Sequence, residues 1–130
     1  MNVNDFLDSV EHVNIIPEKW QKIKSYKMFY LLKDSMSFND IQEHLKKKMD
    51  IFGYKDWRLP TAGELKDIAH CSDVYDISLD RPSWFISKDV RRTRRYGGLV
   101  TVYFSPDYVK TNGATDILRQ SEKCRVILVR

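Results

Sequence analysis

The stretch DWRLPTAGEL, residues 56–65, constrains the fold of this chain more than any other run of its sequence. Thr61 is followed three residues later by Glu64, which is the spacing of a capping box. In that motif each of the two side chains accepts a hydrogen bond from the backbone amide of the other residue. Pro60 directly before the cap fixes the path by which the chain enters the helix. The sequence therefore predicts a helix over roughly residues 62–70, with these side chains directed inward: Leu65, Ile68 and Ala69.

The residues before the cap have side chains suited to anchoring this turn. Trp57 and Leu59 are large apolar groups, and we expect both to lie in the core. Arg58 between them is predicted to pair with the carboxylate of Glu64 or Asp56, in a bidentate contact that locks the turn. Binding of a ligand carboxylate by Arg58 is the alternative. We favour the structural role because the capping box already gives this stretch a task in folding.

A second helix is predicted over residues 37–52, with Ser37 as its N-cap and Gly53 as its C-terminal stop. Its apolar stripe comprises Phe38, Ile41, Leu45, Met49 and Phe52. The lysine run at 46–48 falls mostly off this stripe. We interpret it as the solvated face of an amphipathic helix rather than as a site for an anionic partner.

Most of the remaining elements are predicted strands, rich in β-branched and aromatic residues. They cover residues 26–32, 83–87, 98–104 and 124–129, with a turn at Asn112-Gly113 between the last two. Helical spacing of Phe6, Leu7 and Val10 predicts a helix over residues 3–12, which Pro17 separates from the rest. We expect residues 1–25 to be a short N-terminal helical extension.

The composition excludes several classes of protein. The chain has 130 residues, of which 42% are hydrophobic and 31% charged, as expected for one globular domain. No apolar run reaches the about eighteen residues that a membrane span needs. The start has neither the charged nor the apolar region of a secretory signal, so we expect a cytoplasmic protein.

The reactive side chains form no recognisable catalytic or metal-binding motif. Cys71 and Cys124 make no C-x-x-C pair, and we expect both to be buried thiols. The histidines are scattered along the chain at His12, His44 and His70. We therefore predict a protein that is not an enzyme, with no cofactor and no metal ion.

The run GYKDWRLPTAGELKDI, residues 53–68, resembles the signature of the C-terminal-domain family of bacterial collagen-like adhesins, the Lcl C-terminal domain family. The shared core is Asp56-Trp57-Arg58-Leu59-Pro60-Thr61 followed by Glu64-Leu65. An amphipathic helix before it, the aromatic strand at 83–87 and a final strand containing Cys124 follow the order of the family. The resemblance spans roughly residues 26–130.

This resemblance implies a C-type lectin-like fold over residues 26–130. That fold is an α+β arrangement of two helices with a small, mostly antiparallel, twisted sheet. The family is distantly similar to formylglycine-generating, sulfatase-modifying enzymes, but the close cysteine pair of those enzymes is missing here. A calcium site at Asp73, Asp76 and Asp80 is not favoured, because the Asn/Glu-Pro context of calcium-dependent lectins is absent. The resemblance therefore predicts a scaffold and assigns no activity.

The strongest candidate for binding is the segment KDVRRTRRYG, residues 88–97, which we expect to be a loop. Its candidate partner-binding residues are Lys88, Arg91, Arg92, Arg94, Arg95 and Tyr96. Because the net charge of the chain is only +4, this cluster should dominate the local field. The alternative is a solvated loop or sheet edge whose charges prevent aggregation.

Together these features predict a non-catalytic binding module, an intracellular accessory or inhibitor protein that recognises an acidic protein surface through the cationic loop. The alternative is binding of nucleic acid or a sulfated polysaccharide through the same arginines. A further alternative, which we favour less, is an enzyme that depends on Cys71 or Cys124.

Overall fold

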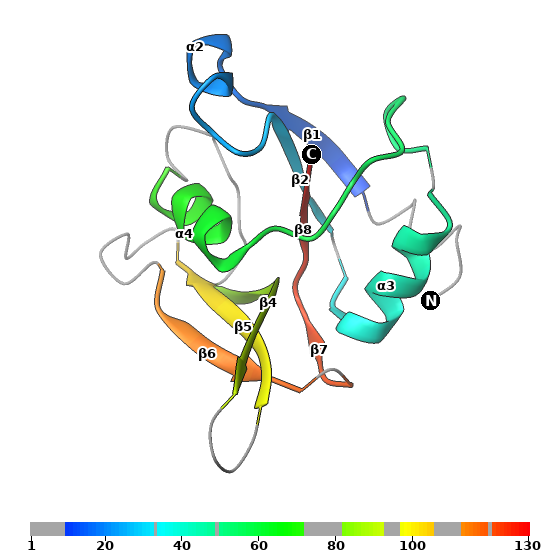
Figure 1. Ribbon diagram of the computed structural model, residues 1–130, viewed down its shortest axis with the longest axis vertical. Coiled ribbons are helices and arrows are strands. Elements are labelled where there is room, and N and C mark those ends of the chain that lie inside the picture. The colour runs from blue at the N-terminus through cyan, green and yellow to red at the C-terminus, as the bar shows by residue number, and fades with distance from the viewer. Residues whose placement is uncertain are drawn as a thin grey trace.

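The computed structural model describes residues 10–32, 34–48, 50–71, 82–92, 97–105, 113–119 and 121–130, with the backbone alone for residues 10–14 (Figure 1). The helices are α2 (Glu18–Gln21), α3 (Phe38–Lys46) and α4 (Ala62–His70). The strands are β1 (Val10–Ile15), β2 (Met28–Leu32), β3 (Met36–Ser37), β4 (Ser83–Arg92), β5 (Gly97–Phe104), β6 (Thr115–Leu118), β7 (Lys123–Cys124) and β8 (Ile127–Val129). No helix in the described ranges is long and apolar enough to cross a membrane.

The α+β class is confirmed, but the strands of the described residues form three small antiparallel sheets where the sequence predicted one sheet. Their orders are β1-β2-β8, β3-β7 and β4-β5-β6. The predicted strand at 124–129 is divided, because Cys124 pairs with Met36 whereas β8 pairs with β2. Figure 1 shows β8 in the middle of the molecule, with α3 and α4 on opposite sides of it.

Two buried clusters of side chains lie against the β1-β2-β8 sheet, and both include residues of β2 and β8. Tyr30 and Leu128 belong to the cluster that α3 covers, whereas Phe29 and Ile127 belong to the cluster that α4 covers. Successive side chains of a strand point to opposite faces, so β2 and β8 each contribute to both clusters. The second cluster also contains Phe85, whose ring centroid lies 4.6 Å from that of Phe104. The sheet thereby joins the two halves of the core.

The helix predicted over residues 62–70 is confirmed as α4, and Leu65, Ile68 and Ala69 are buried as expected. The helix predicted over 37–52 is correct at its Ser37 cap, but it ends at Lys46. Lys48 has a positive φ of 47° and Phe52 one of 54°, so the chain turns there.

The turn after α3 changes which apolar side chain enters the core. Phe52 is 53% exposed, whereas the neighbouring Ile51 is 5% exposed. The carbonyl of Ile51 accepts a hydrogen bond from the Trp57 indole at 3.0 Å, which holds this turn against the core. Phe52 therefore does not belong to the predicted stripe, and Met49 lies outside the described residues.

The helix predicted over residues 3–12 is wrong where the structure describes it. Residues 10–15 form strand β1, which pairs with β2 in antiparallel register, and residues 3–9 lie outside the described residues. Ile16, directly after β1, is 1% exposed in the second cluster. Pairing with β2 therefore outweighs the helical spacing at residues 10–12, and a single helical turn, α2, follows β1.

The turn at Gly113 is present, but it leads to a strand that the sequence did not predict. Gly113 has a φ of 92°, and its amide donates to the carbonyl of Tyr103. The chain then forms β6, which pairs with β5 from Val102 to Leu99. Asn112 lies outside the described residues.

Candidate binding surface at the end of β4

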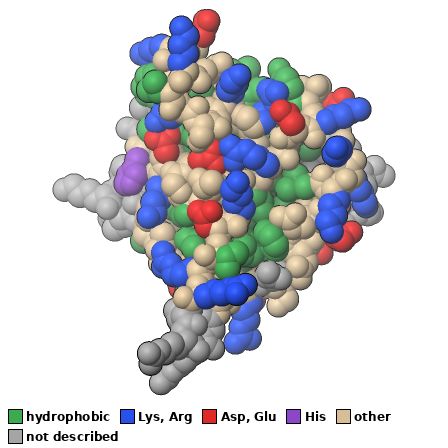
Figure 2. Space-filling view, in the orientation of Figure 1, with side chains coloured by type: hydrophobic (Ala, Val, Ile, Leu, Met, Phe, Trp, Pro, Cys, Tyr) green, Lys and Arg blue, Asp and Glu red, His purple; other side chains and the backbone are tan. Residues whose placement is uncertain are grey.

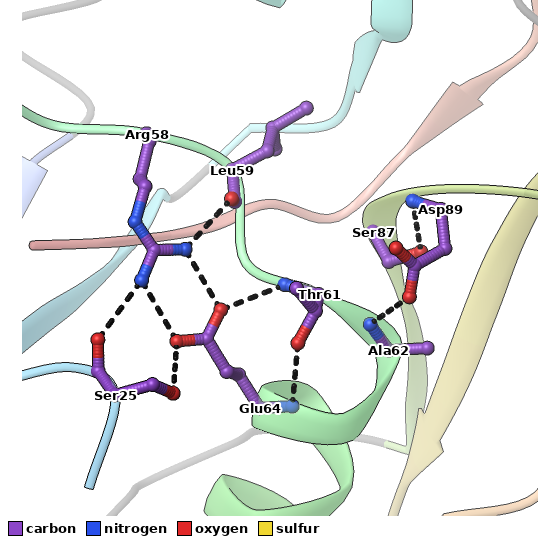
Figure 3. Close-up of polar contacts among 8 residues, drawn as sticks. All are labelled: Ser25, Arg58, Leu59, Thr61, Ala62, Glu64, Ser87 and Asp89. Atoms are coloured by element: carbon purple, nitrogen blue, oxygen red, sulfur yellow. Dashed lines mark hydrogen bonds and ion pairs between the residues drawn. The ribbon is translucent and has the colours of Figure 1, made fainter.

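The predicted pairing of Arg58 is confirmed with Glu64 as the partner (Figure 3). The two terminal nitrogens of Arg58 donate to the two carboxylate oxygens of Glu64 at 2.7 and 2.8 Å. Ser25 adds two contacts, because its carbonyl accepts from Arg58 at 3.0 Å and its hydroxyl donates to Glu64 at 2.6 Å. We call Ser25, Arg58, Thr61 and Glu64 the bracket.

The bracket includes the predicted capping box. The Thr61 amide donates to Glu64 Oε1 at 2.9 Å, and the Glu64 amide donates to the Thr61 hydroxyl at 3.1 Å. Burial by itself would raise the pKa of Glu64. The hydrogen bonds from Arg58, Ser25 and Thr61 outweigh burial and lower that pKa to about 2. The carboxylate is therefore ionised and fully occupied by groups of the protein itself.

The other side chains of the signature also have structural partners. Trp57 and Leu59 are buried, as predicted. Asp56 does not contact Arg58; its carboxylate accepts two hydrogen bonds from Arg130, at 2.7 and 3.1 Å. The guanidinium carbon of Arg130 also lies 3.8 Å from the centroid of the Tyr54 ring. These contacts give the charged side chains of the signature a structural role, in which they link distant segments of the chain.

The residues on either side of Thr61 are hydrogen-bonded to β4 at Lys88 and Asp89. Lys88 donates its amide to the carbonyl of Pro60 at 2.9 Å. The Asp89 carboxylate accepts from the amide of Ala62 at 2.8 Å, at the start of α4 (Figure 3). Ser87 accepts from the Asp89 amide and donates to the carbonyl of Val100. A helix N-terminus favours a carboxylate, so Asp89 fixes β4 to α4.

Sequence reasoning missed the role of Asp89. The contact depends on an irregularity in the pairing of β4 with β5, between Ile86 and Val90. Within this irregularity, Asp89 reaches a helix that begins 27 positions earlier in the chain. No local pattern in the sequence signals a contact of this kind.

The segment predicted as a loop over residues 88–97 is largely strand. Residues 88–92 continue β4, where Arg91 pairs with Gly98 and Arg92 with Gly97 on β5. Arg94, Arg95 and Tyr96 lie outside the described residues. The charged site therefore stands on a strand for at least part of its length, and Arg91 and Arg92 are in register with β5.

The side chains at this end of β4 face solvent. Lys88, Arg91 and Arg92 are exposed, and we call these three residues the basic end of β4. Val90 among them is 57% exposed. In the described part of the chain, none of the three cations has a carboxylate within ion-pair distance. Their donors are available to an external acceptor, in contrast to those of Arg58.

The packing of β6 against β5 requires a glycine at position 98. A Cβ at this position would lie 2.4 Å from the carbonyl oxygen of Leu118 and 2.7 Å from Cγ2 of Ile117. Both atoms belong to β6, so the absence of a side chain lets β6 pack closely against β5. The glycine thereby supports the hairpin from the side opposite to β4.

The other reactive residues are not brought together. Cys124 is a buried thiol whose Sγ donates to the carbonyl of Trp84, and burial raises its pKa to about 11. Cys71 is a partly buried thiol, and His44 lies buried on α3. Among the described residues, no group of three or more His, Cys, Asp and Glu side chains could hold a metal ion. Asp73, Asp76 and Asp80 lie outside the described residues.

The face of the molecule seen in Figure 2 is not continuously basic. Lysine and arginine side chains are distributed across it, with acidic side chains between several of them. Lys46 and Lys47 at the end of α3 are exposed, as predicted for a solvated helix face.

Comparison of the chain with protein-family models, curated proteins and solved structures finds no match. The resemblance to the Lcl C-terminal domain family therefore stays a prediction from the sequence.

Proposed function

We propose that the protein is a non-catalytic binding module that recognises an acidic protein surface through the basic end of β4. The observation that carries this proposal is the exposure of Lys88, Arg91 and Arg92 on a strand whose base is fixed to α4. Each guanidinium presents a planar set of donors that fits a carboxylate in bidentate geometry.

The anchored base of the strand favours binding for an energetic reason. Ordering a side chain and its backbone on association costs free energy, and a preformed strand reduces the backbone part of that cost. The contacts of Pro60 with Lys88 and of Ala62 with Asp89 hold this strand before a partner arrives. The start of α4 therefore serves the proposed site indirectly, by positioning β4.

The choice of a protein partner rests on the mixture of side chains at the site. Val90 is an exposed apolar group between the cations, and the net charge of the whole chain is only +4. A dedicated nucleic-acid site usually carries a broader basic surface. Nucleic acid and sulfated polysaccharide are the alternative ligands for the same arginines, with a steeper dependence of affinity on salt.

The proposal includes the finer expectations from the sequence. We propose a C-type lectin-like arrangement for residues 26–130, supported by the order of α3, the signature, α4 and the aromatic strand β4. We also propose an accessory or inhibitor role in the cytoplasm. A scaffold of this class places its function in the surface that it presents, here the end of β4.

The test is an affinity pull-down from native lysate with two matched variants of the full chain. Arg91→Ala with Arg92→Ala removes two exposed cations from β4, and Lys46→Ala with Lys47→Ala removes two from α3. We expect the first pair to lose partners that the wild type and the second pair retain. Identical partner lists from all three baits would overturn the site, and nuclease-sensitive capture would favour nucleic acid instead.

A further inference from the structure

We propose that the partner contributes an extended acidic segment, which adds to the β4-β5-β6 sheet as a further strand along the outer edge of β4. This inference rests on the proposed function and specifies how the acidic partner is bound. The added strand would lie beside Val90, Arg91 and Arg92.

The position of β4 in its sheet supports this mode. β4 is the outer strand of the order β4-β5-β6, so one edge of it faces away from β5. The described part of the protein bonds to that edge at two amides, of which Ile86 donates to the carbonyl of Arg125 at 3.1 Å and Lys88 to that of Pro60 at 2.9 Å. Within the described ranges, β5 is the one strand that pairs with the part of β4 after Lys88. An unpaired strand edge is a template for main-chain pairing with another chain.

The side chains at the edge specify the chemistry of the added strand. Arg91 and Arg92 are adjacent and therefore point to opposite faces of the sheet. Opposite charges on neighbouring strands stabilise pairing, so acidic side chains at successive positions of the partner would meet both arginines. Val90, 57% exposed, offers an apolar contact to a β-branched neighbour.

The same side chains disfavour a second copy of this edge as the occupant. Pairing two such edges would bring arginine and lysine side chains of both copies together, and like charges directly opposite each other destabilise a sheet. Basic residues on an edge strand are a known means of preventing self-association. The outer edge of β4 therefore disfavours pairing with a second copy of the protein and favours pairing with an acidic strand.

The test uses a short fluorescent peptide in which two adjacent glutamates are flanked by valine and threonine. Two further peptides carry N-methyl groups on alternate residues, one in each of the two frames, with the same side chains and charge. In a paired strand the amides of only one frame face β4. We expect that frame to lose affinity by about tenfold or more, because methylation removes main-chain hydrogen bonds, while the other frame binds like the parent.

The controls separate this inference from the proposed function. Arg91→Ala with Arg92→Ala should weaken binding of the parent peptide, and Lys46→Ala with Lys47→Ala should not. Equal affinity of all three peptides would overturn strand addition while leaving recognition by charge intact. Equal loss in both frames, or no binding of the parent peptide, would also overturn strand addition. The pull-down with native partners then decides the proposed function by itself.

Discussion

The bracket and the basic end of β4 both depend on arginine, but the two regions use it differently. Arg58 makes two hydrogen bonds to Glu64 and one to the carbonyl of Ser25. Arg91 and Arg92 are exposed on β4 and, among the described residues, lack a carboxylate partner. The arginine of the recognisable motif therefore serves folding. Arg91 and Arg92, which lie outside the motif, are the ones with donors left for a ligand.

Removing the carboxylate of the bracket should have the largest effect. Glu64→Ala leaves Arg58 without its partner and removes one half of the capping box. We expect the free energy of unfolding to fall by about 3 kcal/mol, measured by urea denaturation. Glu43→Ala is the matched control on the exposed face of α3, with an expected change below about 0.5 kcal/mol. An equally small change for Glu64→Ala would remove the distinction between the two regions.

Acid should weaken the bracket without any mutation. The pKa of Glu64 is lowered from 4.5 to about 2 in the folded protein, so the unfolded chain binds the proton more readily. The stabilisation is therefore fully present above pH 4.5 and is lost as the pH falls towards 2. Unfolding free energies of the wild type and Glu64→Gln, measured over this range, should converge at the acid end. Parallel curves would show that Glu64 is not the group responsible.

Adding a single methyl group to β5 at Gly98 should destabilise the packing of β5 against β6. Gly98→Ala places a Cβ against the backbone of Leu118, which cannot move without disturbing β6. We expect a loss of about 2 kcal/mol, observed as a lower midpoint of thermal unfolding. Gly63→Ala on α4, where the nearest atom would be 3.8 Å away, is the control and should not be destabilising.

The smallest effect on stability is expected at the proposed site itself. Arg91→Ala with Arg92→Ala should change the free energy of unfolding by less than about 0.5 kcal/mol, because neither side chain is buried. The same pair of changes is expected to abolish partner capture. A large loss of stability would assign these arginines to folding and place them with Arg58.

Local patterns predicted α4 and the contacts among Arg58, Thr61 and Glu64, because these residues lie within a few positions of each other. The contacts of Ser25 with the rest of the bracket span more than thirty positions and were not predicted. Thr61 and Glu64 are three positions apart, and the spacing alone specifies the capping box. Contacts between distant segments could not be predicted in this way. The strand at Val10–Ile15 forms against β2, and Asp89 reaches α4 through an irregular part of β4. The arginine cluster was visible as charge, but the placement of Arg91 and Arg92 on a strand edge depends on three-dimensional pairing.

The central position of β8 has a consequence for how the chain folds. On one side β8 pairs with β2, and on the other the backbone of Val129 pairs with that of Arg58, a residue of the bracket. The contact of Arg130 with Met28 spans 102 positions. A ribosome releases β2, the bracket, α3 and α4 before it releases β8, so neither half of the core is complete until β8 has emerged. Pairing over such distances in sequence is slow, and folding is expected to depend on the arrival of β8.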